Sequence, residues 1–224
     1  MPRSSIIAID GPVASGKTSV GKLLSGELKY RFLDTGIMYR AITWLALDQR
    51  IDVTDEDALG RLACDTVIRL KEGTDGVVLI DGRKVSEELR KPDVERAVSL
   101  VSMVPEVRSA LVAQQREIAQ EGRIVVVGRD IGTVVLPDAD LKLYLSASVS
   151  ERARRRHAEL MRHGRSVEYE QVLNELEARD KLDTGRDHSP LRPAPNAVML
   201  ETDGRDLEQV TEMVLHLLGE DLWP

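Results

Sequence analysis

The sequence has little of what several classes of protein require. Its one cysteine, Cys64, cannot form an internal disulfide, and nothing else suggests a thiolate metal site. Aromatic residues make up 3% of the 224 residues, so the core must be built from Val, Leu, Ile and Ala. No apolar run approaches the length that spans a bilayer, and the one near the N-terminus, interrupted by Asp10, is too short for a signal peptide. We therefore expect a cytoplasmic protein with no membrane partner.

An excess of positive charge is also missing. The formal net charge is −7, which argues against a protein that coats nucleic acid through its electrostatic field. The one basic stretch, residues 151–165, has six arginines but no aromatic side chain on which bases could stack. With 42% hydrophobic and 31% charged residues, the composition is that of a globular protein with one sizeable core and no nucleic-acid partner.

Short apolar runs alternate with helical patterns along most of the chain. Five runs read as buried strands, at residues 6–10, 31–34, 124–128, 141–145 and 197–201. Apolar residues recur at helical spacing over 20–28, 107–118 and 210–218. Such alternation predicts an α/β fold with a parallel sheet covered on both faces. The alternation of strands and helices is interrupted at residues 67–86, where two strand-like runs flank a Gly- and Asp-containing turn. We interpret this hairpin as part of an inserted lobe, about residues 60–100.

The segment "GPVASGKTS" follows the first predicted strand and opens the first predicted helix. Gly11, Gly16, Lys17 and Thr18 fit the phosphate-binding pattern G-x-x-x-x-G-K-[ST]. Glycines let successive backbone N–H groups face phosphate oxygens, and the helix adds the positive end of its dipole. Lys17 would bridge the β- and γ-phosphates, and the Thr18 hydroxyl would ligate Mg²⁺. We therefore expect ATP to be held by the whole loop: Gly11, Pro12, Val13, Ala14, Ser15, Gly16, Lys17, Thr18 and Ser19.

Two further absences narrow the reaction. The N-K-x-D segment of a GTPase switch is missing, and a nucleic-acid motor would usually need a longer chain and a clear acidic metal motif. No histidine forms an identifiable catalytic dyad or triad, although His157, His163 and His188 lie near the basic stretch. A phosphate acceptor is already ionised at neutral pH and needs no general base. The missing base therefore favours a nucleoside monophosphate over a sugar alcohol as the acceptor.

Arginines predict where that acceptor binds. Arg129 and Asp130 follow the third core strand, and the carboxyl end of such a strand faces the ligand crevice of an open α/β sheet. Arg154 and Arg162 we interpret as part of a solvated helix face. The remaining arginines between 151 and 192 more plausibly surround highly charged substrates, since the chain as a whole is acidic.

Six stretches of the chain together resemble the bacterial cytidylate kinase family. They are "IDGPVASGKTS", "LDTGIMYR", "SMVPEVR", "VVVGRDIGTVVLPDADLKLYL", "RDKLDTGRDHSPL" and "DGRDLEQV", and the resemblance runs from residue 6 to about 218. It implies a P-loop NTPase three-layer fold with a five-stranded parallel sheet, an inserted antiparallel monophosphate-binding lobe at about 60–100 and a helical lid at about 150–189. A single domain would place its core at about 1–59, 101–149 and 190–224. The sequence departs from the family pattern at "GKTS" in the loop and at "APNA" at 194–197. Neither departure removes a charged residue to which a role is given below.

The resemblance also implies roles for individual residues. Arg40 would hold the acceptor phosphate with Thr35 nearby, Ser99 and Arg108 would read cytosine, and Asp183 would bind ribose. Asp130 would accept a hydrogen bond from the cytosine amino group, whereas uracil O4 would repel it. The implied catalytic set is Lys17, Arg129, Arg152, Arg156, Arg179 and Arg186, of which Arg152 and Arg156 would belong to a mobile lid over ATP. The implied substrate-binding set is Thr35, Arg40, Ser99, Arg108, Arg129, Asp130, Arg179, Asp183 and Arg186.

The resulting expectation is a monomeric kinase that uses Mg-ATP to phosphorylate CMP or dCMP. Three alternatives stay open: a kinase with UMP or AMP as acceptor, a nucleotide-binding regulatory module without turnover, and a nucleic-acid binder acting through residues 152–165. The acceptor-side arginines speak against the regulatory module, since binding ATP alone does not require them.

Overall fold

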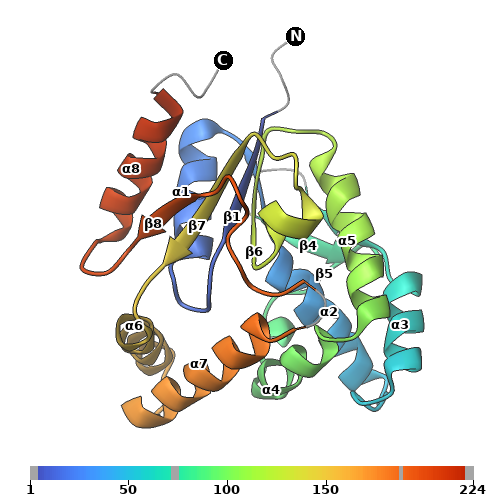
Figure 1. The fold of residues 1–224 in the computed structure, drawn as a ribbon. Helices are drawn as coiled ribbons and strands as arrows, with labels where there is room; N and C mark the ends of the chain where they lie inside the picture. Colours follow the sequence, from blue (N-terminus) through green and yellow to red (C-terminus); the bar gives the residue numbers. More distant parts are fainter. Residues whose placement is uncertain (1–4, 72–75, 187–188, 220–224) are drawn as a thin grey trace.

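A five-stranded parallel sheet with helices on both faces forms the centre of the molecule (Figure 1). The computed structural model describes residues 5–71, 76–186 and 189–219. The strands lie in the order β2-β6-β1-β7-β8, and every pairing is parallel. Their bounds are β1 Ile6–Asp10, β2 Arg31–Asp34, β6 Ile124–Gly128, β7 Leu141–Ser146 and β8 Val198–Glu201. The predicted α/β class and the five predicted strands are confirmed.

Alternating apolar side chains on the central strands build a core on each face of the sheet. Ile7 and Ile9 of β1 pack with α1 and α8, whereas Ala8 packs on the other face with α2 and α5. The central strand β1 is therefore apolar on both sides, as expected for a sheet covered twice. The helices are α1 Lys17–Leu28, α2 Thr35–Asp48, α5 Pro105–Ala119 and α8 Leu207–Gly219.

A small antiparallel sheet packs beside α2 as part of the predicted insert. It has three strands rather than two, β3 Ile68–Leu70, β4 Val78–Ile80 and β5 Arg83–Lys84, and the predicted turn at 72–75 lies outside the described residues. Its inward side chains join the same core as α2, so the insert shares the core of the domain. The surrounding helices are α3 Glu56–Asp65, η1 Glu88–Arg90 and α4 Pro92–Val101, so the predicted limits at 60 and 100 fall inside α3 and α4.

Two helices, α6 Val149–Arg162 and α7 Tyr169–Thr184, lie beyond the carboxyl ends of the strands (Figure 1). They pack on each other through a small apolar cluster that includes Leu160 and Leu176, separate from the two main cores. A last short helix, η2 Ile131–Val135, follows β6 and lies at the same edge of the sheet. No helix in the described part of the chain is long and apolar enough to cross a membrane.

Candidate active site

The loop between β1 and α1 has the conformation of a phosphate cradle. Gly11 has φ 148°, and a Cβ at this position would lie 2.1 Å from the carbonyl oxygen of Leu145, so only glycine fits here. The chain then turns through the loop, and α1 begins at Lys17, which places the first free N–H groups of the helix at the loop. Backbone donors and the helix dipole therefore converge where an anion would bind.

Lys17 is buried inside this loop. Its Nζ donates a hydrogen bond of 2.6 Å to the carbonyl oxygen of Pro12 and lies 3.5 Å from the Oγ of Ser15. Burial, together with the nearby positive charge of Arg129, lowers the pKa of Lys17 to about 7. A phosphate in the loop would favour the charged form of this lysine.

Thr18 contacts a carboxylate that the sequence analysis did not single out. Its Oγ1 donates to Asp34 Oδ2 at 2.9 Å, while Asp34 Oδ1 accepts the Gly36 N–H at 3.0 Å and caps α2. A hydroxyl and a carboxylate oxygen are suitable ligands for Mg²⁺, which usually binds one or two protein oxygens together with waters and phosphates. Among the described residues no group of three or more His, Cys, Asp or Glu could hold a metal ion. The Thr18 hydroxyl and the Asp34 carboxylate fit a site in which waters and phosphates complete the shell.

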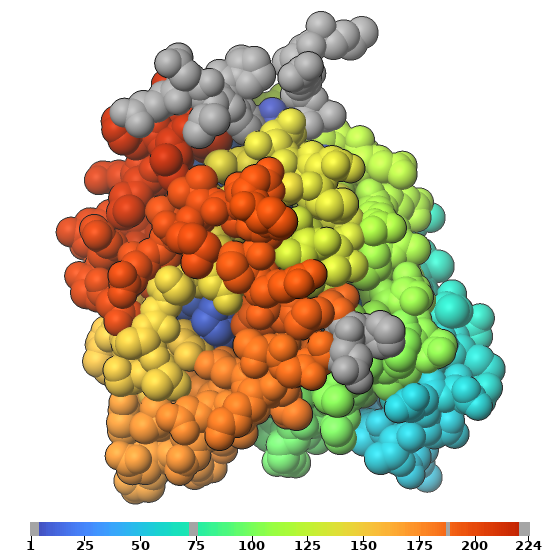
Figure 2. Space-filling view, viewed as in Figure 1, coloured from blue at the N-terminus to red at the C-terminus, as the bar shows by residue number. Residues whose placement is uncertain are grey.

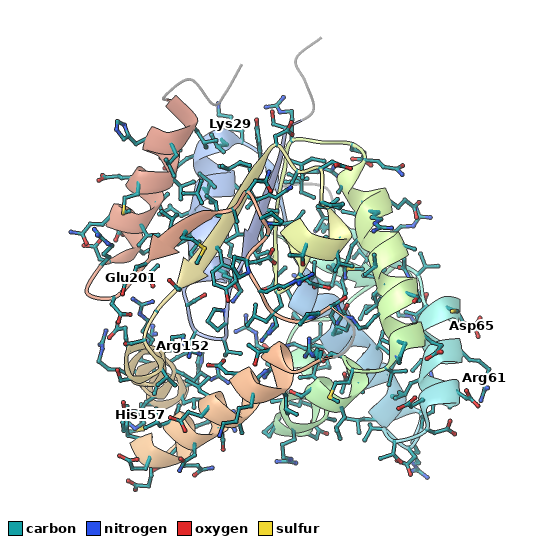
Figure 3. All side chains as sticks on the ribbon, viewed as in Figure 1. Lys29, Arg61, Asp65, Arg152, His157 and Glu201 are labelled. Atoms are coloured by element: carbon teal, nitrogen blue, oxygen red, sulfur yellow. The ribbon has the colours of Figure 1, made fainter. Side chains whose placement is uncertain are left out.

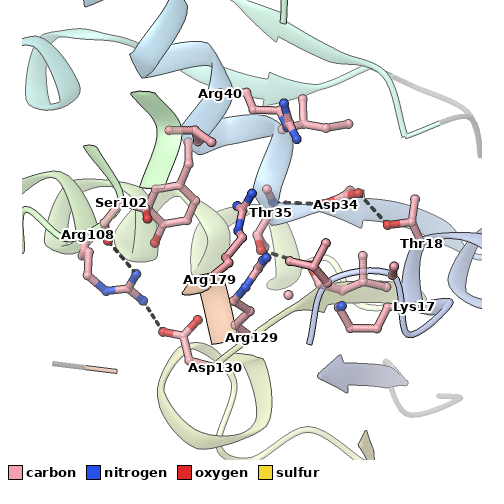
Figure 4. A pocket seen from close by; sticks show the side chains of 18 of the residues that line it. Lys17, Thr18, Asp34, Thr35, Arg40, Ser102, Arg108, Arg129, Asp130 and Arg179 are labelled. Carbon is pink, nitrogen blue, oxygen red and sulfur yellow. Dashed lines mark hydrogen bonds and ion pairs between the residues drawn. The ribbon is translucent and has the colours of Figure 1, made fainter. Parts of the chain in front are cut away.

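An arginine-rich pocket opens next to the loop (Figure 4). In the space-filling view, dark-blue atoms from the N-terminal part of the chain lie in a hollow framed by yellow and orange segments of the C-terminal half (Figure 2). The structure thus brings residues far apart in the sequence together beside the loop. The predicted site residues that line the pocket are Val13, Ala14, Lys17, Thr18, Thr35, Arg40, Arg108, Arg129, Asp130, Arg179 and Arg186.

One wall of the pocket is a buried ion pair between Arg108 and Asp130. The Arg108 guanidinium donates to the carboxylate of Asp130 and, at 3.1 Å, to the carbonyl oxygen of Ser102. It also lies over the ring of Tyr39, 5.5 Å from the ring centre, and burial raises the pKa of Tyr39 to about 12. Tyr39 and Ser102 both line the pocket and were missed by the sequence analysis. Tyr39 lies in the quoted stretch "LDTGIMYR", which was the available signal.

A second charged cluster centres on Asp183 at the end of α7. This carboxylate is 1% exposed and accepts hydrogen bonds from both Arg129 and Arg186. Burial acts to raise its pKa, but the positive charges of Arg129, Arg186 and Arg179 outweigh burial and lower it. Positive charge is in excess here, because three arginines surround one carboxylate.

Arg179 carries much of that excess charge. Figure 4 shows Arg179 and Arg129 close together in the pocket. Burial and the repulsion from Arg129 lower the pKa of Arg179 to about 9. In the part of the chain that the structure covers, the buried Nε atoms of Arg179 and Arg186 have no hydrogen-bond partner. Buried donors of this kind are costly unless a ligand satisfies them, so the cluster suits an anion.

Four of the predicted catalytic and substrate-binding residues do not line the pocket in this conformation: Asp183, described above, and Ser99, Arg152 and Arg156. Ser99 lies on α4 and uses its carbonyl oxygen to accept the hydroxyl of Ser102 at 2.9 Å. Arg152 is buried against α7, where it donates to Asp180 at 2.5 and 3.1 Å (Figure 3). Arg156 bonds Glu95 and Glu159, both at 2.9 Å. Two residues of α6 approach the P-loop: Arg152 donates to the carbonyl oxygen of Val13 at 3.3 Å, and the Nη1 of Arg155 would lie 3.9 Å from a Cβ on Gly16.

The strand–loop–helix cradle, with an arginine-rich pocket at the same edge of the sheet, defines a P-loop kinase fold. Solved structures agree on the fold: shikimate kinase from Bacteroides thetaiotaomicron superimposes with a TM-score of 0.51 at 11% identity, covering 96% of this chain and 98% of that one. Shikimate kinase from Acinetobacter baumannii gives 0.50 at 18% identity, covering 99% and 97%. Within this class, the chain belongs to the cytidylate kinase family, whose sequence model matches residues 7–220.

Full-length relatives support the family assignment. A cytidylate kinase from Pelotomaculum thermopropionicum is 47% identical over 211 residues, which cover 93% of each chain. Those from Carboxydothermus hydrogenoformans and Geobacillus kaustophilus are 45% and 46% identical, covering 95% and 98% of this chain and 96% and 99% of the relatives. The family resemblance predicted from the six sequence stretches is thereby confirmed.

Proposed function

We propose that this protein transfers the γ-phosphoryl group of ATP to CMP or dCMP, forming ADP and CDP or dCDP. Membership of the cytidylate kinase family supports the reaction. The observation that carries the proposal is one pocket lined both by Lys17 of the phosphate loop and by the acceptor-side residues Arg108, Asp130 and Arg179. A donor and an acceptor phosphate can therefore meet there.

Catalysis in this pocket needs charge neutralisation and alignment more than proton transfer. An oxygen of the acceptor phosphate forms the new bond to the γ-phosphorus, and the bond to the β–γ bridging oxygen breaks and leaves its electron pair on ADP. The loop N–H groups and Lys17 would hold the donor, while Arg40, Arg129 and Arg179 would hold the acceptor phosphate beside Thr35. Thr18 and Asp34 would hold Mg²⁺, which when bound neutralises charge on the phosphates.

The Arg108–Asp130 pair supports selection of the base. Asp130 can accept a hydrogen bond from the amino group of cytosine, and its charge would face uracil O4 unfavourably. A guanidinium held over Tyr39 keeps that carboxylate in place and buried. Asp183 would bind the ribose, and Arg186, already bonded to Asp183, would move toward the substrate phosphate.

The lid arginines are proposed to act after a movement. Arg156 must leave Glu95 before it can reach ATP, and Arg152 is held by Asp180. Closure of α6 and α7 over the donor would exclude water and limit hydrolysis. One chain contains every group named here, so the proposed reaction does not require a second subunit.

A coupled ADP-release assay with Mg-ATP and five acceptors, CMP, dCMP, UMP, AMP and GMP, tests this proposal. Fast turnover restricted to CMP and dCMP is the expected result. Turnover with UMP or AMP instead would still show a nucleoside monophosphate kinase, but it would contradict the proposed recognition of cytosine by Asp130. ATP binding without turnover on any acceptor would identify a regulatory module instead.

A further inference from the structure

Asp10 connects the donor loop to the acceptor-side turn. It ends β1 directly before Gly11, and its side chain is buried. Its Oδ1 accepts the N–H of Ile131 and its Oδ2 accepts the N–H of Gly132, both at 2.8 Å. These two residues begin η2 and come immediately after Arg129 and Asp130. One carboxylate therefore grips the far end of the turn that carries two proposed substrate contacts.

The geometry of that turn depends on this grip. Asp10 lies opposite Gly128 in the parallel pairing of β1 with β6, so the chain leaves β6 beside the carboxylate. A Cβ on Gly132 would lie 3.2 Å from Cδ of Lys142, 3.3 Å from the Cβ of Ala194 and 3.4 Å from Asp10 Oδ2, so the turn is closely packed around the carboxylate. Two N–H bonds to one carboxylate fix both the distance and the direction of the chain after Asp130.

Asp10 is separated from the substrates themselves. It is absent from the pocket lining, whereas Arg129 and Asp130 line the pocket. Burial raises the pKa of Asp10 to about 6, although the two N–H donors act in the opposite direction. An asparagine has nearly the same shape but only one accepting oxygen, so it would leave one of the two N–H groups facing an NH₂ group.

We propose that Asp10 is a positioning residue for the acceptor side, which holds the Arg129–Asp130 turn in the orientation that selects and aligns the acceptor. This inference rests on the proposed function, since it assumes that Asp130 reads the base. It sets Asp10 apart from its neighbours in the phosphate loop, whose role concerns ATP.

The test compares Asp10→Asn with a matched control at the other end of β1. Asp140 also accepts a backbone N–H of this strand, that of Ile6 at 2.8 Å, but it is exposed and far from the pocket. For Asp10→Asn we expect kcat/KM for CMP to fall about tenfold or more and the preference for CMP over UMP to fall several-fold, because a small misplacement of aligning groups is costly. The Kd for ATP, measured without acceptor, should stay within about twofold. Asp140→Asn should change none of these values.

Other outcomes distinguish a failure of the positioning role of Asp10 from a failure of the proposed base contact of Asp130. An unchanged CMP preference in Asp10→Asn, or an equal loss of ATP affinity, would overturn the positioning role while Asp130→Ala still tests the base contact. If Asp130→Ala also keeps the CMP preference, both the base contact and the inference are overturned. Should Asp10→Asn fail to fold, Asp10→Glu keeps a carboxylate but moves it by one methylene relative to the N–H groups of Ile131 and Gly132. A loss of CMP preference in that variant supports the inference, and an unchanged preference overturns it.

Discussion

The donor and acceptor sides of the active site are built in opposite ways. The proposed donor side is one loop of consecutive residues, 11–19, which would bind phosphate mainly through its backbone N–H groups. The acceptor side is assembled from side chains on α2, α4, α5, α7 and the turn after β6. A loop of this kind is a preformed cradle, whereas the acceptor side exists only once the whole domain has folded.

The two sides also differ in how their charges are satisfied. Within the described part of the chain Lys17 hydrogen-bonds two uncharged oxygens, those of Pro12 and Ser15, so an arriving phosphate would add direct charge compensation. On the acceptor side, Asp183 is already shared by Arg129 and Arg186. We therefore expect these arginines to exchange part of their contact with Asp183 for contact with the acceptor phosphate. A single substitution can shift the balance between these two sets of ion pairs. The predictions below test this contrast.

Removing Lys17 should have the largest effect. In Lys17→Met we expect kcat to fall about 10³-fold, because a positive charge that is preorganised for the transferring phosphoryl group is lost. Lys22→Met, on an exposed position of the same helix, is the matched control and should retain activity. Steady-state kinetics with saturating CMP checks both variants, and a loss below tenfold for Lys17→Met would contradict the proposed donor role.

Removing Asp183 should mainly cost stability and acceptor binding. Asp183→Asn leaves the partly buried Arg129 and Arg186 without their shared carboxylate, so we expect the free energy of unfolding to fall by about 3 kcal/mol. Urea unfolding measures this loss. Asp206→Ala, which removes the acceptor of the Gln209 N–H at the start of α8 outside the pocket, should cost only about 1 kcal/mol. Similar losses in the two variants would show that the acceptor cluster is not a tightly coupled network.

The pH dependence of stability should report the burial of Asp10. Its folded-state pKa of about 6 exceeds the ordinary value of 3.8, so the folded protein holds a proton that the unfolded chain releases between pH 4 and 6. Its contribution to stability is therefore present below pH 4 and is lost as pH rises through 6. Relative to the wild type, Asp10→Asn should gain about 3 kcal/mol between pH 4 and 7, measured by urea unfolding. A constant difference across this range would show that burial does not perturb Asp10.

Removing Asp130 should shift specificity more than turnover. We expect Asp130→Ala to lower the preference for CMP over UMP about tenfold, the size of one base contact, while the Kd for ATP stays within about twofold. Competition kinetics with CMP and UMP gives the ratio directly. An equal loss of kcat/KM for both acceptors would contradict the base contact and would show that Asp130 only holds Arg108 in position.

The same contrast explains how much could be predicted from the sequence. The core strands and the phosphate loop were predicted because apolar runs and a contiguous motif are local signals. Asp34 was missed because its partner Thr18 lies 16 residues earlier, in the first turn of α1, and the end of β2 comes beside that turn only in the folded domain. Asp10 was interpreted only as an interruption of an apolar run, because its hydrogen-bond partners, residues 131 and 132, are far away in the sequence. The family resemblance implied Ser99, but the structure places Ser102 of the following turn at the pocket.

Glu95 should give the smallest effect, at the boundary between the acceptor side and the lid. It accepts hydrogen bonds from Arg156 and Arg165, at 2.9 and 2.7 Å, and lies 4.0 Å from Arg40, so it competes with an acceptor phosphate for nearby positive charge. Because the site is partly exposed, we expect Glu95→Gln to lower the KM for CMP only about two- to threefold, with a smaller gain at high salt. Glu159→Gln removes the other partner of Arg156 within α6 and should leave this KM unchanged. A higher KM for CMP in Glu95→Gln would show instead that Glu95 holds the nearby arginines in place for the acceptor. The ion pairs of Glu95 would then help acceptor binding rather than compete with it.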